Sequence, residues 1–414
     1  MNVVVIGGGP AGMMAAGMAA KSCNNVILLE KNEKLGKKLA ITGKGRCNVT
    51  NNCVDINELI RNIPRNGKFM YSSIRNFGPS DVIEFFEKLG VSLKIERGNR
   101  VFPCSDRAMD IVSAMEKFLC KRKVNVLHKR AVKIVLNNGQ VSSVITTDGT
   151  IIDADAVVIC TGGKSYPKTG STGDGYDLAK NAGHTIVPVV PSLVPLVSHD
   201  ERCEELQGLS LKNVAVKLVD GENNKIIYDD FGEMLFTHFG VSGPVVLSAS
   251  ANIDFSKFSQ CSMIIDLKPA LSFEQLDKRI IRDFQKNLHK NIINSLNELL
   301  PKKMIPVMVN SAKIPFGIKC ENVTRQMRFS LVGAIKNFAI TIDGARPIDE
   351  AIVTRGGVSV KEIFPSTMES RIVKGLFFAG EVVDVDAYTG GFNLQVAFST
   401  GYTAGNCISK LCEV

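Results

Sequence analysis

Short apolar runs separated by amphipathic segments dominate the first 160 residues. Residues 3–6, 26–29 and 156–160 are continuously apolar. Runs of this length, bounded by polar or glycine positions, are typical of parallel strands that are buried on both faces. Between the first two runs, residues 13–21 are rich in Ala and Met and predict a helix. The order strand–helix–strand predicts an α/β fold with a parallel sheet.

Longer amphipathic segments predict helices further along the chain. Residues 81–89 begin with Asp81 and Glu84 in a capping-box pattern and stop before Gly90. Residues 106–121 place apolar side chains, starting at position 109, every three to four positions on one helical face. Similar patterns predict helices over residues 272–300, 321–336 and 393–406.

Turn residues and prolines divide the remaining chain. Residues 124–153 predict a β-meander, because turns at 137–139 and 148–149 interrupt its apolar segments. Prolines at 188, 191 and 195 predict a linker, so we expect the middle of the chain to be an insertion. Further strands are expected over residues 213–219, 225–229, 233–237, 338–342, 352–360 and 375–381.

Composition places the chain among ordinary globular proteins. Its 414 residues suffice for two or three domains, and 45% are hydrophobic and 22% charged. No run of about 18 apolar residues occurs, and Met1–Ala20 lacks the basic start of a signal peptide, so we expect no membrane contact. Eleven cysteines without CxxC spacing predict reduced thiols in a cytoplasmic protein, with neither a disulfide framework nor a metal site.

A glycine-rich turn joins the first predicted strand to the first helix. It matches G-x-G-x-x-G and reads Gly7-Gly8-Gly9-Pro10-Ala11-Gly12. Gly7 permits the tight turn, Gly9 lets a pyrophosphate approach the backbone, and Gly12 allows close helix packing. Glu30 ends the second strand, where a carboxylate binds ribose hydroxyls. The pattern predicts a dinucleotide site at the helix N-terminus and does not separate FAD from NAD; a glycine-rich turn without a ligand is the alternative.

The chain carries a net charge of +9. Nucleic-acid binding, membrane contact and an anionic cofactor are the usual reasons for such an excess. The densest cationic cluster lies beside the glycine motif and comprises Lys31, Lys34, Lys37, Lys38, Lys44 and Arg46. This placement favours the anionic cofactor, so we do not expect a nucleic-acid partner.

A second motif identifies a family. It reads Lys38-Leu39-Ala40-Ile41-Thr42-Gly43-Lys44-Gly45-Arg46-Cys47-Asn48-Val49-Thr50-Asn51. With the glycine motif and blocks at 160–175, 232–244 and 354–395, the chain resembles the BaiN/YhiN-like family of FAD-dependent oxidoreductases. Members of that family are described as aminoacetone oxidases and as bile-acid 3-dehydro-Δ4,6-reductases. Thr42 and Lys44 depart from the usual S-G-G-G-R-C-N-V-T-N.

The resemblance implies a fold and a cofactor. The fold would be α/β, with a Rossmann-like FAD-binding domain of the glutathione-reductase type and an inserted small β-barrel that itself holds a helical subdomain. The expected boundaries are 1–193 and 358–414 for the FAD-binding domain, 194–270 and 333–357 for the barrel, and 271–332 for the helical insert. Gly380-Glu381 would contact the ribityl and flavin phosphate, and the helix after Gly390-Gly391-Phe392 would point at the flavin.

Together, motif and resemblance predict a set of cofactor-binding positions. They are Gly7, Gly8, Gly9, Pro10, Ala11, Gly12, Glu30, Lys31, Lys38, Gly45, Arg46, Cys47, Asn48, Val132, Thr161, Gly162, Gly380, Glu381, Gly391, Asn393, Leu394 and Gln395. Arg46 could contact a phosphate or an anionic substrate. Cys47 fits packing or flavin contact better than redox chemistry, because no cysteine is suitably spaced to pair with it. Catalytic residues stay unassigned, and His184, His238, Tyr166 and Tyr388 receive no role.

The expected activity is hydride transfer through the flavin N5. NAD(P)H-dependent reduction of a small organic or steroid-like substrate is the first hypothesis. The alternative is an O2-dependent oxidase of a small amine such as aminoacetone, and a tRNA-modifying flavoprotein ranks third. Since the chain has a single G-x-G-x-x-G context, NAD(P)H would bind only transiently near the flavin. Substrate identity and oligomeric state stay open.

Overall fold

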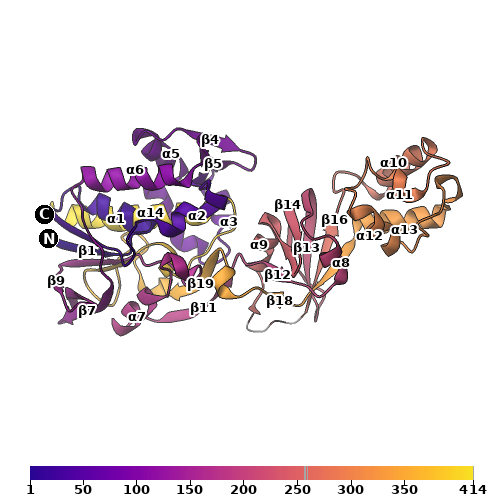
Figure 1. Cartoon of the computed structure of the whole chain (residues 1–414). Coiled ribbons are helices and arrows are strands. Elements are labelled where there is room, and N and C mark those ends of the chain that lie inside the picture. Colours follow the sequence, from indigo (N-terminus) through magenta and orange to yellow (C-terminus); the bar gives the residue numbers. More distant parts are fainter. Residues whose placement is uncertain (256–257, 259, 414) are drawn as a thin grey trace. The chain divides into compact units, whose positions relative to one another are not determined.

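The chain forms two compact units. The computed structural model describes residues 1–255, 258 and 260–413. Unit 1 comprises Met1–Ser192 and Pro347–Val414, and unit 2 comprises Leu193–Arg346 (Figure 1). The second junction lies at Pro347, whereas the sequence placed it at 358. The reason is that strand β19 (Val353–Val358) pairs antiparallel with β11 (Ile186–Ser192) inside unit 1.

Unit 1 is built on a five-stranded parallel sheet. Its strands are β1 (Asn2–Ile6), β2 (Asn25–Leu29), β6 (Asn125–Leu127), β10 (Ala156–Ile159) and β20 (Leu376–Phe378). The order is β20-β10-β1-β2-β6, and every neighbouring pair runs parallel. Every residue of β10 and β20 is buried, as the continuous apolar runs predicted. β6, expected to open the meander, instead forms an edge of this sheet.

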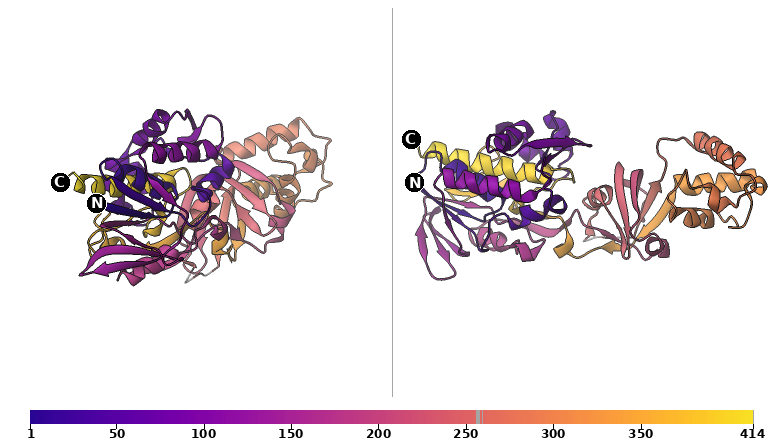
Figure 2. Two further views of the ribbon diagram at one scale, coloured as in Figure 1. Left: turned by 60° about the vertical axis from the view of Figure 1, so that its left-hand side comes forward. Right: turned by 45° about the horizontal axis from the view of Figure 1, so that its top comes forward.

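Two helices from opposite ends of the chain pack along each other in unit 1. They are α1 (Pro10–Ala19) and α14 (Phe392–Leu411). Both termini consequently lie side by side (Figures 1 and 2). A disulfide joins Cys23 to Cys412, which corrects the expectation of reduced thiols throughout. Spacing gave no sign of this pair, because its members are 389 positions apart and meet only through the packing of the two helices.

The other elements of unit 1 surround this core. The helices are α2 (Lys37–Gly45), α3 (Ile56–Arg61), α4 (Tyr71–Asn76), α5 (Pro79–Lys88), α6 (Ala108–Lys121) and α7 (Asp174–Asn181). The strands are β3 (Thr50–Asn51), β4 (Leu93–Glu96), β5 (Arg100–Pro103), β7 (Ala131–Asn137), β8 (Gln140–Thr146) and β9 (Ile151–Asp153). β7, β8 and β9 form the expected antiparallel meander.

Three local expectations in unit 1 were wrong. The helix expected to begin at residue 81, α5, begins at Pro79. Asp81 lies at its third position, where the side chain accepts the Gly78 N–H at 2.7 Å. Met109 of α6 is 48% exposed, because Ile111 rather than Met109 faces the core. The proline-rich stretch is the strand β11. Prolines are tolerated there because β11 pairs with β19 alone, with an irregular register between Val187 and Val190.

Unit 2 contains a seven-stranded antiparallel sheet. Its strands are β12 (Leu196–Val197), β13 (Ser210–Asp220), β14 (Ile226–Thr237), β15 (Gly240–Ser242), β16 (Cys261–Asp266), β17 (Phe338–Ile342) and β18 (Gly344–Ala345). The order is β17-β16-β13-β14-β15-β12-β18. The two strands expected at 225–229 and 233–237 are one strand, β14. Two short helices accompany the sheet, α8 (Glu201–Glu205) and α9 (Pro244–Ser250).

A helical segment interrupts this sheet between β16 and β17 (Figure 1). It contains α10 (Phe273–Gln285), α11 (Ile292–Ser295), α12 (Met304–Ser311) and α13 (Arg325–Lys336). The sequence predicted α10 and α13 and missed α12, whose Pro306 concealed it. Over the described part of the chain, no helix combines the length and the apolar character needed to cross a membrane.

The contact between α1 and α14 depends on glycine. A Cβ at Gly401 would lie 2.3 Å from the Ala11 carbonyl oxygen. We therefore expect Gly401→Ala to destabilise the protein by about 1–3 kcal/mol, as overpacking does. Urea unfolding followed by circular dichroism measures the change. Gly333→Ala is the control, because nothing lies within 4 Å of its Cβ position in α13, and it should match or exceed wild-type stability. Equal stability of the Gly401→Ala variant and wild type would contradict the packing argument.

Candidate cofactor site

Four of the predicted segments meet at one edge of the parallel sheet. Gly7 follows β1, Glu30 follows β2, Thr161 lies two residues beyond β10, and Gly380 lies two residues beyond β20. Parallel strands present their carboxyl ends at a common edge, where open α/β sheets bind their ligands. The structure thus brings the amino-terminal and carboxyl-terminal motifs together.

The glycine motif forms an open cradle above this edge. Gly7 has φ 108°, and a Cβ at Gly12 would lie 1.8 Å from the Gly7 carbonyl oxygen, so both positions require glycine. Gly9 differs, because no atom lies within 4 Å of its Cβ position. α1 begins at Pro10, and the first N–H groups of a helix have no partner within the helix. Free space at Gly9 beside these donors fits a pyrophosphate.

Glu30 is held in place at the end of β2. Its side chain is 8% exposed, and Oε2 accepts the Gly8 N–H at 2.7 Å while Oε1 accepts the Asn32 N–H at 2.8 Å. A carboxylate has about four acceptor positions. The Asn32 side-chain amide also donates to Oε1, at 2.5 Å, so about one position stays available for a ribose hydroxyl, and the bond to Gly8 fixes the carboxylate against the cradle.

Lys31 connects the end of β2 to α7. Its ammonium group donates to the Asp174 carboxylate at 2.9 Å, and Arg130 binds the same carboxylate at 2.9 Å. Thr172 accepts a further hydrogen bond from Lys31. Val132 lies two residues after Arg130 on β7, with its side chain 43% exposed. The charge of Lys31 is thus balanced within the protein.

Lys38 and Glu381 form an ion pair. The Lys38 Nζ lies 3.0 Å from Oε2 of Glu381 and donates to the Ser165 hydroxyl at 2.8 Å. The Thr354 N–H donates to Oε1 of Glu381 at 2.9 Å. A Cβ at Gly163 would lie 2.5 Å from that carboxylate. Because Lys38 neutralises Glu381, this carboxylate would not repel the phosphates of a bound dinucleotide.

Arg46 belongs to an internal charge cluster. Its guanidinium binds Glu96 at 2.5 Å and Asp106 at 2.6 Å, and it lies 4.2 Å above the Phe102 ring. Lys94 also binds Asp106, at 2.7 Å. The two carboxylates engage Nε and Nη2 and offset the charge of Arg46, while Nη1 makes no hydrogen bond among the described residues, so the contact of Arg46 with an anion stays a prediction.

The burial of Cys47 favours a packing role. Its side chain is fully buried, and burial raises the pKa of the thiol to about 12, so no thiolate forms near neutral pH. Lys44 adopts φ 59°, a left-handed conformation that explains why glycine is usual at this position. Asn48 Oδ1 and Thr161 Oγ1 are among the eight buried side-chain polar atoms that lack a hydrogen-bond partner in the described part of the chain. Both belong to predicted cofactor-binding positions, and a ligand would satisfy them.

The start of α14 meets β3. A Cβ at Gly391 would lie 2.4 Å from the backbone of Thr50, and the Asn51 side chain donates to the Gly390 carbonyl at 3.1 Å. Gln395 is fully buried and binds Thr50. Its amide also donates to the Phe77 carbonyl at 3.0 Å, so it supports the fold rather than facing a ligand.

Asn393 closes the loop before α14. Its Oδ1 accepts the Ala387 N–H at 3.0 Å, and its Nδ2 donates to the Ala387 carbonyl at 2.6 Å. Leu394 beside it is half-buried. With Asn393 and Gln395 engaged, the backbone at the helix start is the part of this motif that suits a cofactor.

A buried acidic cluster follows Glu381, and sequence reasoning missed it. Asp386 is 1% exposed, and the Ser192 hydroxyl donates to its Oδ2 at 2.6 Å. Asp384 accepts the Gly356 N–H at 3.1 Å. Burial raises the pKa of both carboxyls, while Arg65 and Arg355 oppose the rise. The i, i+2 spacing of two acids inside an apolar stretch was the available signal.

The histidines show structural contacts. His184 is buried, shares a 2.8 Å hydrogen bond with the Ser370 hydroxyl, and packs edge-on against Phe378. His238 packs against the neighbouring Phe239 ring in unit 2. These contacts assign neither imidazole a chemical role.

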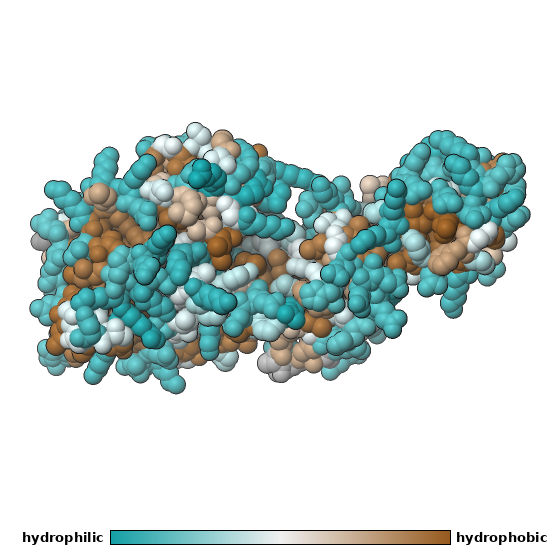
Figure 3. Space-filling view, in the orientation of Figure 1, coloured by the Kyte–Doolittle hydropathy of each residue, from teal (hydrophilic) through white to brown (hydrophobic). Residues whose placement is uncertain are grey.

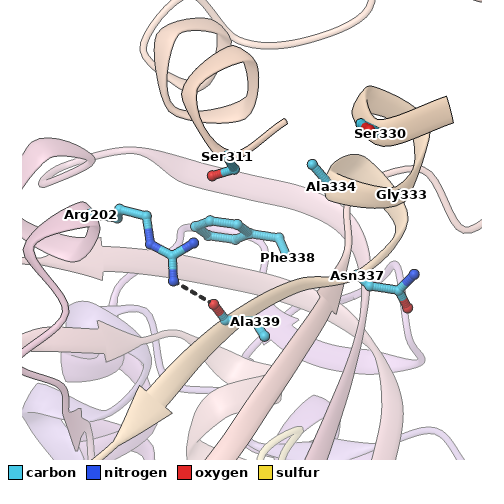
Figure 4. A pocket seen from close by; sticks show the side chains of 8 residues that line it. All are labelled: Arg202, Ser311, Ser330, Gly333, Ala334, Asn337, Phe338 and Ala339. Atoms are coloured by element: carbon cyan, nitrogen blue, oxygen red, sulfur yellow. Dashed lines mark hydrogen bonds between the residues drawn. The ribbon is translucent and has the colours of Figure 1, made fainter. Parts of the chain in front are cut away.

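A groove of about 300 Å³ in unit 2 contains none of the predicted positions (Figure 4). Arg202 points into it, 4.8 Å from the Phe338 ring. Its guanidinium is bound by Asp200 at 2.5 Å and by the Ala339 carbonyl at 2.7 Å. Because Asp200 neutralises Arg202, the groove lacks an uncompensated charge for a dinucleotide.

Comparison with known proteins agrees with this geometry. A family model described as the HI0933-like protein Rossmann domain matches residues 1–407. The chain is 33% identical over 413 residues to the 3-dehydro-bile acid delta(4,6)-reductase of Clostridium scindens, covering 99% of both. It is 30% identical over 405 residues to the ribosomal RNA dihydrouridine synthase of Escherichia coli, covering 97% of this chain and 96% of that protein.

Solved structures share the fold. A 3-ketosteroid delta1-dehydrogenase from Sterolibacterium denitrificans matches with a TM-score of 0.54 and 13% identity, covering 99% of both chains. The open conformation of a flavocytochrome c3 fumarate reductase matches with a TM-score of 0.53 and 18% identity, covering 99% of this chain and 78% of the other. The expected family resemblance and the α/β Rossmann-type fold are confirmed.

The free space at Gly9 leads to the first prediction for this site. Gly9 has φ −79° and ψ −177°, which any residue adopts, so Gly9→Val should fold normally while its side chain fills the cradle. We expect FAD to bind at least about tenfold more weakly, a loss of about 1.4 kcal/mol. Flavin fluorescence titration of the FAD-free proteins measures it. Gly317→Val is the control, since its Cβ position is equally open. Unchanged FAD affinity would rule out Gly9 as part of the cradle.

The second prediction concerns pH and Asp386. Because its folded-state pKa is raised, the stability linked to this carboxyl is present below its unfolded pKa and lost as pH rises through the folded pKa. Asp386→Asn should therefore melt higher than wild type at pH 8, with the difference shrinking towards pH 4. Asp200→Asn should show the opposite sign at pH 8, since the hydrogen bond from Arg202 lowers the pKa of Asp200. A pH-independent difference for Asp386→Asn would contradict the account.

Proposed function

The chain belongs to the HI0933-like Rossmann family and is an FAD-dependent oxidoreductase, and we propose that it reduces a carbon–carbon double bond conjugated to a carbonyl group. The names of its two relatives describe one type of reaction. A 3-dehydro-bile acid delta(4,6)-reductase and a dihydrouridine synthase both add two hydrogens across such a bond. The cradle at Gly9, beside the fixed Glu30 carboxylate, is the observation that supports a dinucleotide cofactor for this chemistry.

The residues of unit 1 would divide the work of holding FAD. The cradle at Gly9 and the start of α1 bind the pyrophosphate, and Glu30 binds ribose hydroxyls. The ion pair of Lys38 and Glu381 has no net charge, so it would not repel the phosphates of FAD. The start of α14 directs its positive end at the flavin and stabilises negative charge there. When bound and reduced, FAD supplies the hydride.

The electron donor in this proposal is NAD(P)H. One NAD(P)H and one proton are consumed, one carbon of the acceptor gains a hydride and its neighbour gains a proton, and NAD(P)+ leaves. The chain carries a single G-x-G-x-x-G sequence, so the donor would bind transiently. Two acceptor classes fit this reaction, a small steroid-like enone and the uracil ring of an RNA.

An anaerobic experiment tests the reaction. NADH or NADPH is added to the FAD-loaded protein, and we expect the absorbance band of oxidised flavin to bleach. A 3-oxo-4,6-diene steroid or a uridine-containing ribosomal RNA fragment is then added, and one of them should restore the band and gain two hydrogens by mass spectrometry. Protein without FAD is the control.

The oxidase alternative gives the opposite pattern. The nicotinamides would leave the flavin oxidised, aminoacetone would bleach it, and O2 would restore the band with formation of hydrogen peroxide. That result would overturn the proposed reduction.

A further inference from the structure

The positive charge of the chain is concentrated in the helical segment of unit 2. Residues 267–337 contain thirteen Lys and Arg against five Asp and Glu, a net charge of +8 over 71 residues, whereas the 260 residues of unit 1 contain 31 Lys and Arg against 24 Asp and Glu, a net charge of +7. Residues 193–266, which hold most of the sheet of unit 2, contain five basic and eleven acidic residues. Beside the glycine motif, by contrast, Lys31, Lys38 and Arg46 are all paired with carboxylates. Three of the six cations that the sequence placed there are therefore offset, while Lys34, Lys37 and Lys44 form no ion pair among the described residues.

One helix carries a regular row of this charge. Lys278, Arg282 and Lys286 recur at every fourth position along α10 and its C-cap, and all three are exposed. The apolar residues of α10, among them Leu276 and Ile280, are buried, and α10 packs on α13. At 100° per residue the three cations face away from this buried side. We call these three residues the α10 basic stripe. On the face of the helical segment that Figure 3 shows, hydrophilic residues cover most of the surface.

The fold itself gains nothing from this row. Like charges four residues apart on a helix repel each other and cost stability. The nearby acids serve other residues, since Asp277 binds Arg328 at 2.5 Å and Asp283 binds Arg279 at 2.7 Å. Among the described residues, Lys278 and Lys286 form no ion pair. Arg282 lies 4.0 Å from Asp283, a buried carboxylate already bound by Arg279.

We infer that the α10 basic stripe docks the phosphate backbone of RNA. This inference rests on the proposed function, because it assigns that function's acceptor to the RNA class. A row of cations that repeats about every 6 Å along a helix suits a chain of phosphates better than a single small anion. The inference departs from the sequence-based expectation of no nucleic-acid partner, which relied on the cations beside the glycine motif.

An anionic membrane is the competing partner for a basic helix. A helix that lies on a bilayer inserts an apolar face beside its basic one. The apolar face of α10 is occupied, because Leu276, Ile280 and Phe284 are buried. Apart from Phe273 and Leu288 near its two ends, which are 40% and 44% exposed, α10 offers no exposed large apolar side chain beside the stripe, which favours RNA.

The test measures binding without turnover. The FAD-loaded full chain is titrated into a fluorescein-labelled single-stranded oligouridylate, and fluorescence anisotropy is followed at several salt concentrations. The variant is Lys278→Glu, Arg282→Glu and Lys286→Glu combined. We expect its Kd to rise at least about tenfold, and the slope of log K against log salt to fall by about 2, near 0.7 for each lost phosphate contact.

A matched control separates the stripe from net charge. Lys180→Glu, Lys361→Glu and Lys374→Glu combined change the charge by the same amount on exposed residues of unit 1. The control variant should bind RNA with a Kd within about twofold of the wild-type Kd, because it weakens only the general electrostatic attraction. Melting curves by circular dichroism establish that both variants fold.

Two results would overturn the inference. Equal losses in both variants would show that overall charge, not the stripe, attracts RNA. Wild-type binding to phosphatidylserine vesicles but not to the oligouridylate would assign the stripe to a membrane. Because the measurement uses oxidised protein, failure of the proposed reduction would leave the binding result interpretable. Conversely, failure of the stripe would leave reduction of a steroid-like enone standing.

Discussion

Helix α1 begins directly above the carboxyl edge of the sheet because no side chain stands between Gly12 and Gly7. A single methyl group at Gly12 would lie 1.8 Å from the Gly7 carbonyl oxygen. On its other side, α1 meets α14 through Gly401 and Gly405, whose Cβ positions lie 2.3 Å from carbonyl oxygens of α1. These close approaches bring the two chain ends together, and with them the two halves of the cofactor site.

Charge is organised differently in the two units. At the cofactor site every prominent cation has a carboxylate partner, as in the pairs Lys38–Glu381 and Arg46–Asp106. Such pairs position side chains in a polar environment while leaving little net field. The positive electrostatic potential at the site comes instead from the backbone N–H groups at the starts of α1 and α14. In unit 2 the helical segment keeps a net positive charge after its own ion pairs, such as Arg328–Asp277, are counted.

A single fold can serve both acceptor classes named for its relatives. The flavin carries the hydride chemistry in either case, and the protein contributes binding and orientation. An enone steroid and a uracil ring offer the same reacting group on very different bodies.

The sequence determined the parallel sheet, the glycine turn and the acidic end of β2, because each depends on a short run of residues whose chemistry is local. Buried strands need unbroken apolar runs, and a turn at φ 108° needs glycine at position 7. The tertiary structure alone decided which partner each charge takes. Arg46 reaches Glu96 and Asp106, 50 and 60 positions away, and these carboxylates offset its charge. It also decided the Cys23–Cys412 disulfide, the buried cluster around Asp386 and the return of the chain to unit 1 at Pro347. These three features depend on residues that lie far apart in the sequence and meet only through packing. The sequence pattern does not show which distant residues become neighbours.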